Sequence, residues 1–177
     1  GNSVVIAGGS DFPDMKPWEE GKKAYYKDIY ILDETEGKYY CILSETSLPV
    51  PLGNGCSASD GKTLFCFGGC NSTETSETVY AIRMADGTLQ VDSVSRLPEG
   101  FMPTAAAIHK NEIYVHGVQQ RKNVLYKFIP ASGKWTRLAG CPDRIISEGA
   151  SLVYQHNGKE EALYLIGGRG QDSDGLY

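Results

Sequence analysis

The stretch "NGCSASDGKTLFCFGGCNSTETSETVYAIRMADGTL", residues 54–89, holds four short runs of small or apolar residues separated by turn residues. The first run is made of small residues, and the second ends in Gly-Gly. The third carries Tyr80, and the fourth begins with Leu89 just after a glycine. Short apolar runs bounded by Gly, Asn and Asp are typical of β-strands joined by turns. The stretch therefore predicts a four-stranded sheet, with strands A to D in chain order.

The same order of features recurs along the chain. A Tyr followed by six residues, a Gly, one residue and a large apolar residue begins at Tyr30, Tyr80 and Tyr126, so the period is close to 50 residues. The glycine phrase that closes strand B occurs at 6–9, 66–69, 115–118 and 165–168. Within one domain, 1–177, the sequence divides into approximate units 1–49, 50–98, 99–143 and an incomplete 144–177.

Repeated small sheets bury both faces when they stack radially, as in a β-propeller. Small-residue runs at 54–59, 103–108 and 148–153 suit the strand nearest the axis, where space is tightest. A period near 50 residues with Gly-Gly, Tyr and Trp in this order is typical of kelch repeats. We therefore predict an all-β, kelch-type β-propeller of about three to three and a half four-stranded blades. The alternative fold is a β-sandwich.

The last residues, "DSDGLY" at 172–177, resemble the start of another strand C. Since propellers close into rings of typically 4–8 blades, we expect this chain to form about half of a six-bladed ring. Either the remaining blades of a longer product or a second copy of the chain, as a homodimer, would complete it.

Composition excludes some functions. Twenty-two acidic residues against 17 basic ones give a formal net charge of −5, which argues against a nucleic-acid partner. No apolar run approaches the ~20 residues of a membrane helix, so no membrane span is expected. The five cysteines are an odd number and do not read as a disulfide framework. Cys66 aligns with core positions of the other units, and the histidines are scattered, so we predict a core cysteine and no metal site.

The segment "IAGGSDFPDMKPWEEGKKAYYKDIYIL", residues 6–32, is more specific than a generic repeat. It resembles the cyclically permuted mutarotases, the bacterial N-acetylneuraminate epimerases (sialic acid mutarotases). This resemblance implies a six-bladed kelch propeller, exported to the periplasm of a bacterium, that acts as an isomerase on an anionic or N-acetylated sugar. It implies no metal or organic cofactor.

The resemblance also implies a Glu directly after a strand-B glycine phrase. The four such positions hold Ser10, Cys70, Gln119 and Arg169 instead. We therefore expect this chain to supply only part of an active site.

Several residues near the glycine ends are candidates for that part. The loop over 10–26 is about ten residues longer than its counterparts, and an enlarged loop is often functional. Predicted substrate-binding residues, chosen as charged, amide or aromatic groups near this end, are Asp11, Trp18, Lys22, Lys23, Asn54, Arg121 and Arg169. Glu148, a carboxylate just before a predicted inner strand, is the candidate for an acid–base role.

Two other interpretations remain open. A non-catalytic kelch module could bind a protein or glycan partner through the same loops, since one fold hosts many functions. The chain could also be a degenerate product of gene breakage without activity.

Overall fold

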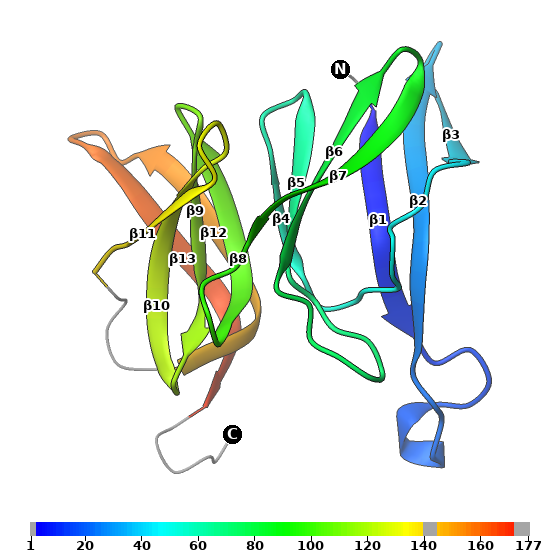
Figure 1. Ribbon diagram of the computed structural model, residues 1–177, viewed down its shortest axis with the longest axis horizontal. Helices are drawn as coiled ribbons and strands as arrows, with labels where there is room; N and C mark the ends of the chain where they lie inside the picture. The colour runs from blue at the N-terminus through cyan, green and yellow to red at the C-terminus, as the bar shows by residue number, and fades with distance from the viewer. Residues whose placement is uncertain (1–2, 140–144, 172–177) are drawn as a thin grey trace.

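The computed structural model describes residues 3–139 and 145–171, and this part of the chain is all-β apart from the short 3-10 helix η1, Pro17–Glu19 (Figure 1). The strands are β1 Val4–Asp11, β2 Ala24–Thr35, β3 Lys38–Leu43, β4 Cys56–Ser59, β5 Thr63–Phe67, β6 Thr78–Ala85, β7 Thr88–Arg96, β8 Phe101–His109, β9 Glu112–Gln119, β10 Lys122–Ile129, β11 Lys134–Arg137, β12 Ile145–His156 and β13 Glu161–Gln171.

Among the described residues the strands form four antiparallel sheets, each built from consecutive strands. Sheet 1 has the order β1-β2-β3, sheet 2 the order β4-β5-β6-β7, sheet 3 the order β8-β9-β10-β11, and sheet 4 is the pair β12-β13. The predicted all-β class is confirmed for the described residues. The predicted grouping of strands into A-B-C-D quartets is found in sheets 2 and 3. Sheet 1 contains strands B, C and D, and sheet 4 contains A and B.

Tight turns follow the predicted turn residues. The β2–β3 and β6–β7 hairpins turn at Glu36-Gly37 and Asp86-Gly87, where both residues have positive φ. Two central residues with positive φ are characteristic of the type I′ turn, which matches the twist of a hairpin. The β9–β10 hairpin uses the same conformation at Gln120 and Arg121, with φ of 49° and 58°. Arg121 therefore lies at the tip of a turn.

The glycine phrases do more than end a strand. Gly8 and Gly9 have φ of 68° and 130°, and β1 continues past them to Asp11 through an irregularity in its register. A Cβ on Gly8 would lie 2.5 Å from the Leu52 carbonyl oxygen, so the chain after sheet 1 passes directly against this glycine. The expectation that the glycines end strand B is right for β5 and wrong for β1, β9 and β13, which continue past their glycine phrases. In β1 the positive φ angles of Gly8 and Gly9 coincide with the irregularity in its pairing with β2, whereas β13 pairs regularly with β12 through Gly167.

The sheets pack face to face in chain order, with an apolar cluster at each of three junctions. The junction between sheets 2 and 3 is the most extensively buried, and its fully buried side chains include Phe67, Val115 and Phe128. The junction between sheets 1 and 2 contains Ile29, Tyr80 and Ile82, which are also buried. The junction between sheets 3 and 4 contains smaller side chains, Ala105, Ala107 and Leu152. These serial junctions account for most of the buried core.

Candidate functional site

One edge of the molecule gathers nearly all the candidate residues. Antiparallel pairing places the first residues of β4, β8 and β12 beside the glycine ends of β5, β9 and β13. The long loop after β1 descends to the same edge, at the bottom of Figure 1. Lys23, near the end of this loop, contacts Asn54 just before β4, and Gly9 of β1 donates its N–H to the Leu52 carbonyl at 2.8 Å. The candidates chosen from separate parts of the sequence therefore lie at one edge of the fold.

A pocket of about 280 Å³ opens at this edge, and we call it the rim pocket. Its lining comes in pairs from the segment just before β4 and from the first halves of β8 and β12: Asn54, Gly55, Pro103, Thr104, Glu148 and Gly149. Three polar side chains from three successive sheets thus meet around one hollow. The amide, hydroxyl and carboxylate together suit a ligand rich in hydroxyl groups.

Asn54 is held in a defined orientation. Its Oδ1 accepts a hydrogen bond from Lys23 Nζ at 3.4 Å, and its Nδ2 donates to Cys70 Sγ at 3.6 Å. Lys23 Nζ also lies 5.4 Å from the centre of the Tyr25 ring, and a cation in this position is attracted to the ring face. The pKa of the Tyr25 phenol is raised, first by desolvation and then by the neighbouring Cys70 thiol. The predicted residues Lys23 and Asn54 are therefore in direct contact, although they are 31 positions apart.

Glu148 and Arg169 are also brought together. They are Cα partners in the β12–β13 ladder, and both side chains are exposed at the rim. An irregularity in the pairing lies between Ile146 and Glu148. A bulge often re-aims a side chain near a functional site. The carboxylate and the guanidinium that the sequence proposed for separate roles thus share one edge of sheet 4.

The other predicted residues lie elsewhere on this edge and do not line the rim pocket. Asp11 is engaged locally, since its Oδ1 accepts a hydrogen bond from the Tyr26 hydroxyl at 2.8 Å. Trp18 is 76% exposed on the 3-10 helix, with Lys16 Nζ 5.5 Å from its ring centre. Lys22 and Arg121 are exposed. Trp18 therefore does not anchor a packed loop and remains accessible to a ligand.

The structure adds two residues, Thr104 and His116, that were not predicted from the sequence. His116 is completely buried, and its Nδ1 lies 2.8 Å from the Thr104 hydroxyl, which lines the rim pocket. Its Nε2 is buried without a hydrogen-bond partner among the described residues. The only sequence signal is that His116 replaces a residue that is Ala7, Phe67 or Ile166 in the other glycine phrases.

Burial lowers the pKa of His116, so the ring is neutral at pH 7. We assign its proton to Nδ1, because a proton on Nε2 would be a buried donor without an acceptor. Nδ1 then donates to Thr104 Oγ1. The Thr104 hydroxyl hydrogen is left for the His116 carbonyl oxygen, 3.4 Å away, or for a ligand in the pocket.

This buried ring predicts a pH dependence of stability. Below the ordinary pKa of a histidine, about 6.5, the unfolded chain takes up a proton that the folded chain resists. The free energy of unfolding should therefore fall as the pH drops below about 6.5, with a contribution from His116 of at most about 1.4 kcal/mol per pH unit. Urea unfolding between pH 7.5 and 5.5 measures this. The slope should be smaller in His116→Phe, and an equal slope in both proteins would contradict the assignment.

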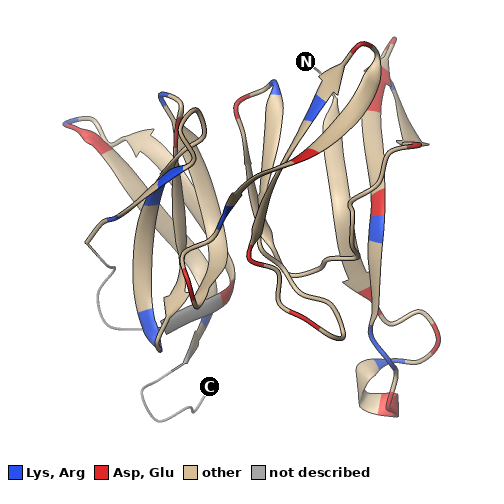
Figure 2. Cartoon of the chain, viewed as in Figure 1, with Lys and Arg blue, Asp and Glu red and all other residues tan. Residues whose placement is uncertain are grey.

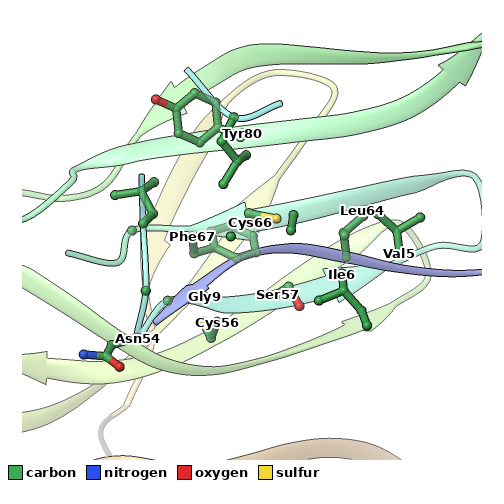
Figure 3. Close-up of a pocket in the computed structure, with 17 residues that line it drawn as sticks. Val5, Ile6, Gly9, Asn54, Cys56, Ser57, Leu64, Cys66, Phe67 and Tyr80 are labelled. Carbon is green, nitrogen blue, oxygen red and sulfur yellow. The ribbon is translucent and has the colours of Figure 1, made fainter. Parts of the chain in front are cut away.

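A second pocket, of about 360 Å³, lies between sheets 1 and 2 beside β1 and β4 (Figure 3). Asn54 lies at one end of it, and Val5 and Leu64 lie at the other. Desolvation raises the pKa of Cys66, which packs against the core, to about 11. The predicted core role of Cys66 is confirmed, and its thiol is protonated at neutral pH.

Neither a scan against protein-family models nor a search of curated proteins finds a significant match to this chain. Within 3–139 and 145–171, no three His, Cys, Asp or Glu side chains gather in an arrangement suited to a metal ion. The same residues contain no helix with the length and apolarity of a membrane span. The functional interpretation therefore depends on the geometry of the rim pocket.

Proposed function

We propose that this chain is part of a kelch-type β-propeller, about three and a half blades of a six-bladed ring, that binds an anionic or N-acetylated sugar at the rim pocket. The activity proposed is interconversion of the sugar's anomers, as in a sialic acid mutarotase. The bacterial periplasm is the expected compartment, and no cofactor is expected. The convergence of Asn54, Thr104 and Glu148 from three successive inner strands carries this proposal.

The packing of the sheets supports the propeller. Four consecutive sheets contact one another face to face in chain order, and the small-residue strand is at the same edge of sheets 2, 3 and 4. In a propeller this strand lies nearest the axis. The starts of these strands would then surround the mouth of the axial channel, which is a frequent location for ligand sites.

The charges at the rim support an anionic sugar. Lys23 and Arg169 lie at this edge, and a guanidinium suits a carboxylate because it is planar and can donate two parallel hydrogen bonds. Asn54 and Thr104 supply an amide and a hydroxyl for sugar hydroxyls or an N-acetyl group. Trp18, exposed on the neighbouring loop, offers an aromatic face for a sugar ring.

Anomer exchange needs one base and one acid. The base takes the proton of the anomeric hydroxyl, and the bond between the anomeric carbon and the ring oxygen breaks as that oxygen is protonated. The open-chain carbonyl then recloses on its other face. Glu148 is the carboxylate of the rim pocket and would serve as the base. The second proton-transfer group would come from water or from a part of the ring outside this chain.

A non-catalytic glycan- or protein-binding module is the second candidate. It is favoured by one observation: Glu148 is the only ionisable group among the described residues that line the rim pocket. Two such groups would be expected for a complete acid–base pair.

Exchange spectroscopy by NMR separates the two functions. With N-acetylneuraminate as the probe, the protein should raise the rate of exchange between the anomeric signals above the buffer rate. Line broadening of the sugar signals without faster exchange would indicate the binding module. Unchanged rates and unchanged linewidths would contradict both.

A further inference from the structure

The two terminal sheets each leave an apolar face exposed. On the outer face of sheet 1, Ile6, Tyr39 and Leu43 are 51%, 67% and 56% exposed. On the outer face of sheet 4, Tyr164 and Ile166 are 39% and 57% exposed. Figure 2 shows that many charged residues lie in turns and near strand ends, although β2 of sheet 1 also carries some along its length. Exposed apolar faces of this kind mark interaction surfaces.

The alternation of side chains along strand B shows which neighbouring sheet each face of a sheet is directed to. In sheet 2, Phe65 and Phe67 of β5 point toward sheet 3, whereas Leu64 and Cys66 point toward sheet 1. Alignment on the glycine phrases gives each strand B the same alternation. Every sheet therefore has one face directed to the preceding sheet and one directed to the following sheet.

The outer face of sheet 1 is a face directed to a preceding sheet. Its Ile6 occupies the position of Val115, which is fully buried against sheet 2. Its Tyr30, 38% exposed, occupies the position of Tyr80 and Tyr126, which are 7% and 8% exposed at their junctions. Side chains that are buried in the equivalent places of sheets 2 and 3 are thus exposed on sheet 1.

The outer face of sheet 4 is a face directed to a following sheet. Its Ile166 occupies the position of Phe67, which is completely buried against sheet 3. Its neighbour Val153, the Cα partner of Tyr164 and 37% exposed, occupies the position of Ala58. A hollow of about 380 Å³ lies over this face, lined in part by Val153, Tyr164 and Ile166.

The outer face of sheet 4 and the outer face of sheet 1 therefore correspond to the two sides of a junction between successive sheets. The chain contains three such junctions. We propose that sheet 4 of one chain docks on sheet 1 of a second copy, head to tail. The partner is a second copy because its face has the apolar side chains at the complementary register. The contact is heterologous, so two copies close a ring only if the rotation per sheet allows it, and otherwise open chains form. This inference rests on the register and not on the proposed sugar chemistry.

Charge substitutions on either face test the proposal. Ile6→Asp places a charge on the outer face of sheet 1, and Ile166→Asp places one on the outer face of sheet 4, so each should prevent docking on that face. Both positions are exposed, and the fold should tolerate the change. By sedimentation velocity from 1 to 200 µM, the wild-type chain should associate as concentration rises. Each variant alone should sediment as a monomer, with association weakened more than tenfold. An equimolar mixture should form a heterodimer of twice the 19.3 kDa chain mass, because each variant retains the half that the other lacks.

Met84→Asp is the matched control, since Met84 is 56% exposed but belongs to sheet 2, on the side directed to sheet 1 and not on a terminal face. It should associate like the wild type. Tyr39→Lys and Val153→Lys, with circular dichroism, repeat the test if the first pair fails to fold. A wild-type chain that stays monomeric at 200 µM would overturn the proposal. The two exposed faces would then be binding surfaces for a different polypeptide segment. Self-association of either Ile variant alone would overturn the head-to-tail geometry.

Discussion

Replacement of Phe67 by alanine is expected to lower the free energy of unfolding by about 3–5 kcal/mol. The ring is completely buried between sheets 2 and 3 and meets the rings of Phe128 and Trp135 edge to face, at 5.9 and 6.0 Å. Alanine would remove apolar contact and leave a cavity at the most extensive junction. Because domains are stable by only about 5–15 kcal/mol, the variant should be close to unfolding at room temperature.

Urea denaturation followed by tryptophan fluorescence measures this change, because Trp135 contacts the substituted ring. Met84→Ala, a similar truncation at an exposed position, should change the free energy by less than about 0.5 kcal/mol. If the two variants unfold at the same urea concentration, the junction between sheets 2 and 3 does not stabilise the fold as described.

Glu148→Gln is expected to reduce any anomer exchange activity by roughly 10²- to 10⁴-fold, the usual contribution of a general acid–base group. The amide retains the shape of the side chain and its capacity for hydrogen bonds but cannot accept the hydroxyl proton. Affinity for the sugar should change by less than about tenfold, since one hydrogen bond is worth about 0.5–1.5 kcal/mol. This expected loss of rate applies only if the chain has the proposed anomer exchange activity.

Exchange spectroscopy gives the rate and a chemical-shift titration gives the affinity. Glu160→Gln is the control, because Glu160 lies in the β12–β13 turn, at the opposite end of sheet 4. Equal losses of rate in both variants would point to damage to the sheet, and an unchanged rate in Glu148→Gln would remove Glu148 from the mechanism.

The repeat made much of the fold accessible to sequence reasoning. Turn pairs such as Asp86-Gly87 and the alternation around Phe67 depend on local backbone geometry, so strands and hairpins could be predicted from short segments. The continuation of β1 past Gly8 to Asp11 could not. It depends on the pairing of Gly9, Ser10 and Asp11 with Tyr26, Tyr25 and Ala24, which lie beyond the long loop.

The candidate site was predicted less completely. Asn54 and Glu148 were selected because each directly precedes a predicted small-residue strand, although the structure places Glu148 inside β12. The contact between Lys23 and Asn54 required the long loop to fold back. Thr104 and His116 were missed because their importance comes from a contact between neighbouring strands. The imidazole of His116 becomes informative only once the structure shows that it is buried and that its Nε2 has no hydrogen-bond partner within the described part of the chain.

Each sheet in this protein is assembled from one continuous segment of chain, and this has a consequence for biosynthesis. Sheet 2, for example, uses only residues between Cys56 and Arg96. Short sequence separations between paired strands favour fast folding. During synthesis each sheet could therefore fold as soon as its own segment has left the ribosome. Each new sheet would then pack against the exposed apolar face of the sheet before it.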